Sequence, residues 1–497
     1  MNVLAFDLGA SSGRGILARF DGKKITLEEI HRFEHNFSIL NGHAYWNIVS
    51  LFDEMKEGMR LCKEPLSGVG FDTWGVDCGI LDAQGNLLGL PCSYRDAALD
   101  DDNMNMVLSL LAPDGTPEEE RTAAGERYVF GQTGIASLAY NTLYKLCYMM
   151  EEMPAQMSVA DKVLFMPNLI EYLFSGVKHS EYSIASTSQL FDMRNKCWAT
   201  GLMAQLGLEP KLFAPVDYAG KDLGTLHPEI ASEVGQDNLH IISVSGHDTA
   251  CAVAAVPARE EEFTFLSSGT WSLLGISSNT LLEGDDVIKN KISNEGTWDG
   301  GYRPTVNIIG LWMNQELRRC FRREGKEYAF AQMNEMAASS EPLRSFIRPD
   351  DFMQPGDYPA QIREYCKKTG QPVPETDGAL VRCVLESLAM KYRQVYQTLK
   401  PYITWEEKLY IVGGGAQNQV LNQFTANALG IPVITGASEA TAVGNVMEQL
   451  YALGAYQTRE EKCDILAASF ETGQYLPQDT DAWDEAYERF QALYRMA

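Results

Sequence analysis

The chain has 497 residues, of which 41 are basic and 67 acidic, so its formal net charge is −26. A charge of this sign repels nucleic acids and anionic membrane surfaces, which argues against both as partners. Hydrophobic residues make up 45% of the sequence, which excludes wholesale disorder, and the length predicts two large domains.

The ten cysteines form no C-x-x-C pair and no cluster with the spacing of zinc ligands. Scattered thiols in a chain of this length are typical of a reducing compartment. Asp7 lies where a secretion signal would need an apolar run, and no apolar stretch reaches the ~18–20 residues that span a bilayer. We therefore expect a soluble cytoplasmic protein, either a monomer or a homodimer.

Three segments share a strand–turn–strand pattern, in which apolar alternation surrounds a short polar turn. They are residues 1–20, 68–90 and 263–276. The first and third lie near the starts of the two halves, which indicates an internally duplicated fold. We predict an N-terminal domain over 1–244, a C-terminal domain over 245–455 and a tail over 456–497 that packs on the body.

Apolar residues at helical spacing predict helices over 48–62, after an N-cap at Asn47, and over 142–151 and 378–399. A β-α-β-α unit follows, with the chain turning at three glycines after the strand LYIV. The acidic segment 97–127 has few large apolar residues, which favours a solvated surface excursion over a functional lid.

Two turns of small residues could hold phosphate groups, because such turns direct backbone N–H groups and hydroxyls into one concavity. The first follows Asp7 and runs to Arg14, and the second is Ser267–Ser272. Either turn alone could be a plain hairpin. Two of them, one in each half, could face each other and hold a triphosphate, with Asp7 binding Mg²⁺ through water.

Two further motifs could carry chemistry. Asp248 lies between a strand and a helix, where it could act as general base on a sugar hydroxyl that attacks the γ-phosphate of ATP. The alternative is that Asp248 or Thr249 only caps the helix. The glycines of Gly413–Asn418 could let a flat ring lie close to the backbone, or could simply form a tight turn.

Together these stretches resemble the FGGY carbohydrate kinases, which have the actin-like ATPase fold. The resemblance rests on FDLGASSGR, GFDTWGVD, the Tyr94-Arg95-Asp96 triplet, NTLYKL, SGHDTA, LSSGTWSL, NIIGLW and IVGGGAQN, which occur in family order from residue 6 to 418. It implies an α/β protein of two actin-like (ribonuclease H-like) domains with a cleft between them. It also implies an ATP- and Mg²⁺-dependent kinase that phosphorylates a small-molecule ketose.

The resemblance further implies roles for individual residues. The ATP phosphates would contact Ala10, Ser11, Ser12, Gly13 and Arg14. Other parts of the nucleotide would contact Thr270, Gln315 and Gly414. The sugar site would contain Gly75, His247, Asp248, Thr249 and Asn307, with Asp248 as catalytic base. Asp7 would position the Mg²⁺ ion.

Alternatives remain at this point. A few pocket residues decide which ketose such a kinase takes. A protein of another class, an actin-like nucleotide switch, would share the phosphate turns and the glycines but would not need a sugar site centred on Asp248. A nucleotide sensor without catalysis would be favoured only if Asp248 were replaced. In a kinase we expect the two halves to close on their ligands, with a hinge near Gly246.

Overall fold

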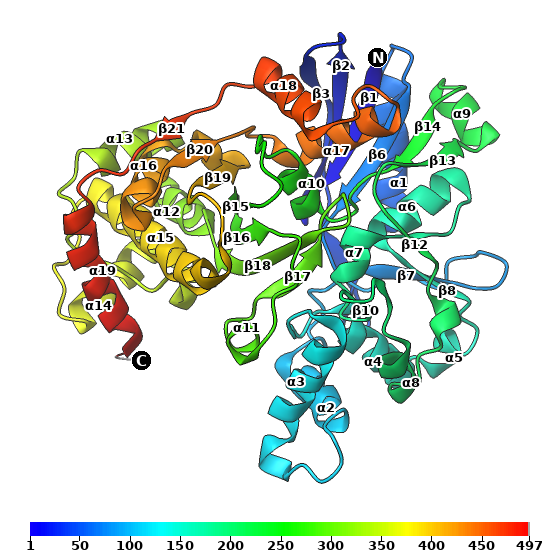
Figure 1. Ribbon diagram of the computed structural model, residues 1–497, viewed down its shortest axis with the longest axis horizontal. Helices are drawn as coiled ribbons and strands as arrows, with labels where there is room; N and C mark the ends of the chain where they lie inside the picture. The colour runs from blue at the N-terminus through cyan, green and yellow to red at the C-terminus, as the bar shows by residue number, and fades with distance from the viewer. Residues whose placement is uncertain (496–497) are drawn as a thin grey trace. The chain divides into compact units, whose positions relative to one another are not determined.

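The computed structural model describes residues 1–495, and the chain divides into two compact units (Figure 1). Unit 1 contains Met1–Ala255, Ser278–Pro304 and Thr441–Ser469, and unit 2 contains Val256–Ser277, Thr305–Ala440 and Phe470–Ala497. These units differ from the domain ranges 1–244, 245–455 and 456–497, because later segments of the chain return to unit 1. The sequence ranges of the domains stay a prediction.

Unit 1 is built on a six-stranded mixed sheet in the order β13-β14-β6-β1-β2-β3. These strands are β1 (Asn2–Leu8), β2 (Ser12–Phe20), β3 (Ile25–Glu34), β6 (Gly68–Thr73), β13 (Lys221–Thr225) and β14 (His240–Ser243). Strand β1 runs antiparallel to β2 and parallel to β6, and β14 also runs parallel to β6. Three strands of this sheet therefore end at the same edge.

The remaining elements of unit 1 are short strands and helices around this sheet. The strands are β4 (Phe37–Leu40), β5 (His43–Trp46), β7 (Cys78–Leu81), β8 (Lys162–Phe165), β9 (Ser180–Glu181), β10 (Phe191–Asp192), β11 (Cys197–Trp198), β12 (Val216–Asp217) and β17 (Ser293–Gly296). The helices are α1 (Ile48–Leu61), α2 (Asp101–Leu110), α3 (Arg121–Thr133), α4 (Thr142–Glu152), α5 (Pro154–Met157), α6 (Met166–Ser175), α7 (Tyr182–Ser186), α8 (Thr200–Gln205), α9 (Pro228–Val234), α10 (Asp248–Ala254), α11 (Asp285–Lys289), α17 (Ala440–Ala452) and α18 (Arg459–Ser469).

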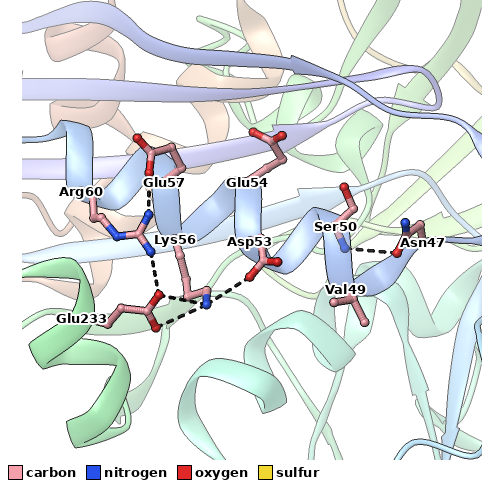
Figure 2. Close-up of a pocket in the computed structure, with 9 residues that line it drawn as sticks. All are labelled: Asn47, Val49, Ser50, Asp53, Glu54, Lys56, Glu57, Arg60 and Glu233. Carbon is pink, nitrogen blue, oxygen red and sulfur yellow. Dashed lines mark hydrogen bonds and ion pairs between the residues drawn. The ribbon is translucent and has the colours of Figure 1, made fainter.

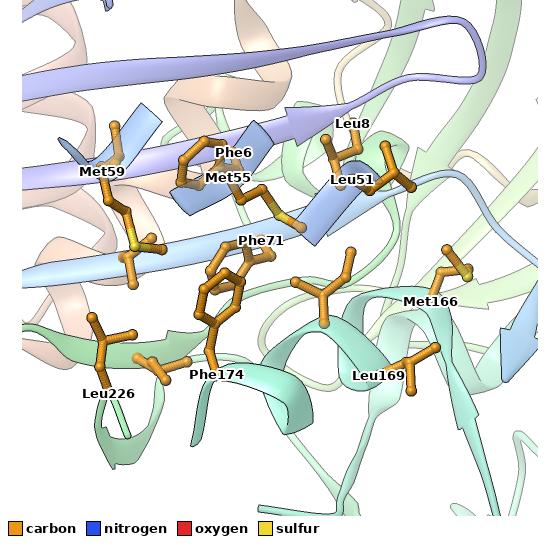
Figure 3. Close-up of a cluster of buried hydrophobic side chains, with 14 of the residues drawn as sticks. Phe6, Leu8, Leu51, Met55, Met59, Phe71, Met166, Leu169, Phe174 and Leu226 are labelled. Atoms are coloured by element: carbon orange, nitrogen blue, oxygen red, sulfur yellow. The ribbon is translucent and has the colours of Figure 1, made fainter. Parts of the chain in front are cut away.

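The core between the sheet and its helices is aromatic and aliphatic (Figure 3). Phe71 stacks between Phe6 and Phe174, with ring centroids 5.6 and 5.2 Å away. Helix α1 contributes buried Met55 and Met59 from the predicted apolar stripe, and Asn47 caps it by accepting a hydrogen bond from the Ser50 amide. The predicted helix, its N-cap and its buried face are confirmed.

Unit 2 contains neighbouring strands in the order β18-β16-β15-β19-β20-β21. They are β15 (Phe263–Ser268), β16 (Trp271–Ser277), β18 (Tyr302–Ile309), β19 (Leu409–Val412), β20 (Val433–Thr435) and β21 (Gln474–Tyr475). Its helices are α12 (Trp312–Arg323), α13 (Phe330–Ala338), α14 (Tyr358–Lys368), α15 (Asp377–Leu399), α16 (Gln419–Leu429) and α19 (Thr480–Arg495). The predicted long helix and the β-α-β-α unit that follows it are confirmed.

Of the three predicted strand–turn–strand segments, two are hairpins and one is not. Strands β1 and β2 pair with each other, as do β15 and β16. In the middle segment, however, β6 lies in the main sheet and β7 pairs with β8 instead. Both predicted strands of this segment are present, but they do not pair with each other, because apolar alternation indicates a strand and not the partner that it takes.

The acidic segment 97–127 contains helix α2 and the start of α3. Asp101, Asp102 and the short turn Glu118–Glu120 are exposed, as predicted for a solvated face. Val107 and Leu108 are buried, so the segment is also anchored by its own small apolar contact. Across residues 1–495, no helix is both apolar and long enough to pass through a membrane.

Helices α10 and α17 meet so closely that only glycine fits at one point. A Cβ atom at Gly444 on α17 would overlap the Cys251 carbonyl group of α10. We expect Gly444→Ala to lower the free energy of unfolding by about 1–3 kcal/mol, because the overlapping atom belongs to backbone and cannot rotate away. The measurement is chemical denaturation of the variant and the wild type.

Gly131 in α3 supplies the matched control, since a Cβ there would meet nothing within 4 Å. Gly131→Ala should be neutral or stabilise by about 0.5–1 kcal/mol through the better helix propensity of alanine. Equal effects of the two substitutions would contradict the close packing of α10 and α17.

Candidate active site

The predicted motifs of unit 1 lie at one edge of its sheet. Strand β1 ends before the turn at Gly9, β6 ends before Gly75, and β14 ends before His247. The three strands are parallel, and Thr73 forms a parallel bridge to His247. The carboxyl edge of parallel strands is where α/β proteins usually place their ligands. The fold thus brings together three motifs that lie up to about 240 residues apart in the sequence.

The first phosphate turn is a tight hairpin with an open tip. The Gly9 amide donates to the Ser12 carbonyl at 3.0 Å, and Ser11 is exposed. Gly13 is required by packing, because a Cβ there would overlap the Phe33 ring. Arg14 lies opposite Asp7 in the β1–β2 register and forms an ion pair with it. The arrangement leaves Ala10, Ser11 and Ser12 at the tip and a balanced ion pair beneath them.

Asp248 is the first residue of α10, and His247 occupies the N-cap position without a side-chain capping bond. The Asp248 carboxylate lies 3.4 Å from His247 Nε2, and its side chain is 29% exposed. Burial is the main reason that the pKa of Asp248 is raised, and the charge of Asp7 raises it further. A partly exposed carboxylate of raised pKa suits a general base better than a structural cap.

The backbone that carries Asp248 is held by buried carboxylates. Glu448 accepts hydrogen bonds from the amide and the hydroxyl of Ser245, and Glu181 accepts from the Gly246 amide at 2.9 Å. The next amide, of His247, donates to the Ser183 hydroxyl at 3.3 Å. Three consecutive N–H groups are therefore fixed, which restricts the direction in which the following residue points.

Gly246 has a clear packing function. A Cβ atom there would lie 2.7 Å from a ring carbon of Pro167 and 3.0 Å from Cβ of Ile184. This close packing is sufficient to explain why residue 246 is a glycine. The expected hinge motion at Gly246 stays a prediction.

Gly75 lies directly beside His247, since a Cβ on the glycine would be 3.3 Å from His247 Nε2. The next residue, Val76, has a φ of +67°, a strained conformation for a β-branched side chain. Its amide donates to the Thr187 hydroxyl at 3.1 Å, and its carbonyl accepts from the Thr142 hydroxyl at 2.7 Å. Strain maintained in this way is common at ligand sites.

A buried ion pair supports the same strained segment. Asp77 and Lys145 are both fully buried and form an ion pair. The other Asp77 oxygen accepts from the indole N–H groups of Trp46 and Trp74. Asp77 and Lys145 lie in the GFDTWGVD and NTLYKL stretches, but neither residue was assigned a role from the sequence, and their pairing was not predicted.

Asp72 adds a third carboxyl group near Asp7 and Asp248. It is fully buried, pairs with Asp7 in the β1–β6 register, and accepts from the Asn445 amide at 2.7 Å. Burial first, and then the charge of Asp7, raise the pKa of Asp72 well above its usual range. Within residues 1–495 no cluster of three or more His, Cys, Asp or Glu side chains forms a metal cage. An Mg²⁺ ion here would need phosphate oxygens and waters as its other ligands, which is its usual preference.

The motifs of unit 2 also meet at a sheet edge. Strands β15 and β19 are parallel, with Ser267 opposite Val412, so the second phosphate turn and the glycine triplet are adjacent. Gly413 has a φ of +85°, and a Cβ there would lie 2.9 Å from the Ser268 carbonyl oxygen. A Cβ at Gly415 would overlap the Ser268 hydroxyl, whereas Gly414 faces open space. The triplet therefore presents exposed backbone at its middle residue.

Two predicted nucleotide residues contact each other in unit 2. The Gln315 amide donates to the Thr270 hydroxyl at 3.4 Å, and the Trp312 amide donates to the Thr270 carbonyl at 3.2 Å. Both Thr270 and Gln315 are exposed. Asn307 lies on β18 opposite Leu273 of β16 and is also exposed. These polar groups are neutral donors and acceptors on a rigid edge.

A surface pocket along α1 and α9 does not suit ATP (Figure 2). Its two basic residues, Lys56 and Arg60, both form ion pairs with Glu233. The other ionisable groups that line it are carboxylates. The excess of negative charge opposes binding of a triphosphate.

The sequence matches the FGGY family of carbohydrate kinases in both halves, the N-terminal domain over residues 2–255 and the C-terminal domain over 264–453. The chain belongs to this family. It is therefore a two-domain carbohydrate kinase that uses ATP, and the alternative of an actin-like nucleotide switch is set aside.

Relatives of this kinase extend over its whole length. It is 40% identical to a rhamnulokinase from Bacteroides thetaiotaomicron, with 99% of each chain covered. It is 35% identical to a rhamnulokinase from Mannheimia succiniciproducens, covering 96% of this chain and 95% of that one. The fold resembles a xylulose kinase from Rhodospirillum rubrum, with a TM-score of 0.81, 18% identity and coverage of 100% and 99%. A Plasmodium falciparum glycerol kinase with ADP gives a TM-score of 0.77 at 13% identity, covering 99% and 98%.

The carboxylate that holds Ser245 makes the stability of this kinase depend on pH. Burial raises the pKa of Glu448 to about 8 from its ordinary value of 4.5. The folded protein therefore retains a proton that the unfolded chain releases, so folding stability falls as the pH rises between these two values. We expect Glu448→Gln to remove this loss, which amounts to at most ~1.4 kcal/mol per pH unit.

The measurement is the free energy of unfolding at several values between about pH 5 and pH 8. Glu461→Gln is the control, because backbone amides of Gln457 and Thr458 lower the pKa of Glu461. That carboxyl is ionised in both states over this range, so its removal should leave the slope unchanged. Identical slopes for the wild type and Glu448→Gln would contradict the raised pKa.

Proposed function

We propose that this kinase transfers the γ-phosphate of ATP to O1 of L-rhamnulose, giving L-rhamnulose 1-phosphate and ADP. The observation that carries the proposal is a site centred on Asp248, in a chain that is 40% identical to a rhamnulokinase over 99% of both lengths. The likeness to two xylulose kinase structures, at 18% and 13% identity, supports the fold alone. L-Fuculokinase and L-xylulokinase activities are the competing possibilities.

In the proposed reaction Asp248 acts as general base. Its carboxylate accepts the proton of the sugar O1–H while O1 forms a bond to the γ-phosphorus. The bond between that phosphorus and the β–γ bridging oxygen breaks, and ADP leaves with the electron pair. His247, Thr249 and the backbone at Gly75 hold the sugar beside the base, and Asn307 contributes a further sugar contact.

We propose that the nucleotide is held by turns of small and uncharged residues together with Arg14. Its phosphates contact Ala10–Gly13 and Arg14, while Thr270, Gln315 and Gly414 hold the rest of the molecule. Asp7 would hold Mg²⁺ through water, and the ion would supply positive charge to the transferring phosphate. The partners are thus the ketose and ATP. We further propose a cytoplasmic enzyme, monomeric or homodimeric; its ten free cysteines support a reducing compartment.

The identity of the base is tested by Asp248→Asn. The amide retains the shape of the side chain but cannot accept the proton, so kcat should fall by about 100- to 10,000-fold. Calorimetry should show that the sugar and ATP still bind. Asp285→Asn is the matched control, because Asp285 is also the first residue of a short helix of unit 1 but is exposed. Near-normal turnover of Asp248→Asn would refute this assignment.

The sugar is tested with a panel of ketoses and ATP, scored by release of ADP. We expect the highest kcat/KM for L-rhamnulose, above the values for the ketoses L-fuculose and L-xylulose. In those sugars a hydroxyl that points in another direction leaves polar groups of the site unpaired. Such a mismatch costs about 1–3 kcal/mol. Equal kcat/KM values across the panel would reduce the assignment to a general ketose kinase.

A further inference from the structure

Arg303 is fully buried, and it contacts the side chains of His247 and Thr249, the residues directly before and after Asp248 in the sequence. It lies at the start of β18, in the part of that strand up to Pro304 that belongs to unit 1, and has no exposed side-chain surface. One terminal nitrogen donates to the Thr249 hydroxyl, and the other donates to His247 Nδ1 at 3.0 Å. The same nitrogen also donates to Glu295 on β17. A buried guanidinium is costly unless it is paired, so such a placement calls for an explanation.

We propose that Arg303, held by Glu295, is a positioning residue that fixes His247 as the neutral tautomer with its proton on Nε2 and orients the Thr249 hydroxyl for the sugar. The proposal rests on the proposed function for the identity of the sugar only. It concerns residues that act through His247 and Thr249 and do not themselves meet the substrate.

The tautomer follows from which atoms face each other. A guanidinium nitrogen has no lone pair to offer, so an N–H group of Arg303 can bond to Nδ1 only where Nδ1 has a lone pair. The ring proton then lies on Nε2, which is 3.4 Å from the Asp248 carboxylate and next to Gly75. His247 thereby presents a hydrogen-bond donor on the side of the proposed sugar site.

Glu295 by itself would favour the other tautomer of His247, with the proton on Nδ1, and Arg303 opposes this effect. Its carboxylate lies 3.2 Å from His247 Nδ1 and could accept a hydrogen bond from that nitrogen if the ring proton were on Nδ1. Arg303 forms an ion pair with that carboxylate, and its guanidinium nitrogen lies 3.0 Å from Nδ1, closer than the Glu295 oxygen. Burial alone would raise the pKa of Glu295, but the pKa is lowered overall, and the charge of Arg303 is the largest cause of the lowering. The carboxylate therefore neutralises the guanidinium and leaves Nδ1 to accept from it.

Thr249 is oriented by the same guanidinium. Arg303 donates to the Thr249 oxygen, so one lone pair of the hydroxyl is occupied. The hydroxyl also lies 3.3 Å from His247 Nδ1, but Arg303 already donates to that nitrogen, which leaves the hydroxyl hydrogen for another acceptor. Two donors, on His247 and Thr249, then flank one acceptor, the Asp248 carboxylate. Such a pattern discriminates between sugars whose hydroxyls point in different directions.

The first test needs no substrate. Protein labelled with ¹⁵N at its seven histidines gives separate chemical shifts for a protonated nitrogen and one with a lone pair, and His247→Gln assigns the signals of interest. We expect a lone pair at Nδ1 and a proton at Nε2 near neutral pH. A proton at Nδ1 of the wild-type protein would overturn the proposal, whatever sugar the enzyme takes.

The second test separates positioning from stability. Arg303→Lys retains the charge but not the forked donors, so kcat/KM for the best ketose of the panel should fall about 10- to 100-fold, with KM for ATP unchanged. The His247 signals should shift in the same variant. Arg382→Lys is the matched control, because it alters another buried Arg–Glu pair, with Glu386 in unit 2. It should lower stability without changing kcat/KM for the sugar.

The outcomes are distinct. If Arg303→Lys keeps both the wild-type tautomer and the wild-type kcat/KM for the sugar, the proposal is wrong. If Arg303→Lys does not fold, Glu295→Gln replaces it, and an unchanged tautomer and kcat/KM there would be equally decisive. If the wild type accepts no ketose at all, the proposed function fails, while the tautomer measurement still decides the role of Arg303.

Discussion

The parallel pairing of β1, β6 and β14 is the constraint on which the site of unit 1 depends. Each strand delivers one motif to the same edge, so Asp7, Gly75 and Asp248 become neighbours through backbone hydrogen bonds alone. The register matters as much as the direction. A slip of one residue would turn Asp7 away from Asp72 and place an apolar side chain at the edge instead.

Precision at this edge is maintained by buried charge. Glu448, Glu181 and the Arg303–Glu295 pair contact residues 245–249 directly. The Asp77–Lys145 pair supports the neighbouring segment at Val76. Removing one member of such a pair costs about 3–5 kcal/mol, whereas an apolar replacement of both is often neutral. Buried pairs are therefore poor sources of stability. Their value here is that each one specifies the direction of a backbone or side-chain group that an apolar contact would leave free.

Local sequence signals predicted much of this fold. The α1 stripe, its cap at Asn47, the two hairpins and the positions of the small-residue turns all depend on residues within one element, where spacing and turn chemistry are decisive. The partner of β7 was not predictable, because strand pairing depends on the whole topology.

The supporting residues of the site were missed for the same reason. Glu448 contacts Ser245 from 203 positions away, and Arg303 contacts His247 from 56 positions away. For Glu448 a signal did exist. Asn445, Glu448 and Gln449 interrupt an otherwise apolar helix, and all three are fully or almost fully buried. Polar residues on the buried face of a helix indicate partners, although they do not say which.

The proposed binding edges of the two units differ in the charged groups that they carry. In unit 1 the carboxylates of the proposed site are balanced locally, Asp7 by Arg14, while burial favours the neutral form of Asp72. In unit 2 the corresponding edge carries Thr270, Gln315 and the glycine triplet, which have no charge at all. A protein of net charge −26 repels a nucleotide at long range. It can bind ATP only where its own carboxylates are absent or neutralised and where short-range donors take over. Gly413 and Gly415 pack directly against Ser268, Gly413 against its carbonyl and Gly415 against its hydroxyl, so that the glycine triplet and the second small-residue turn form one edge that carries no charge.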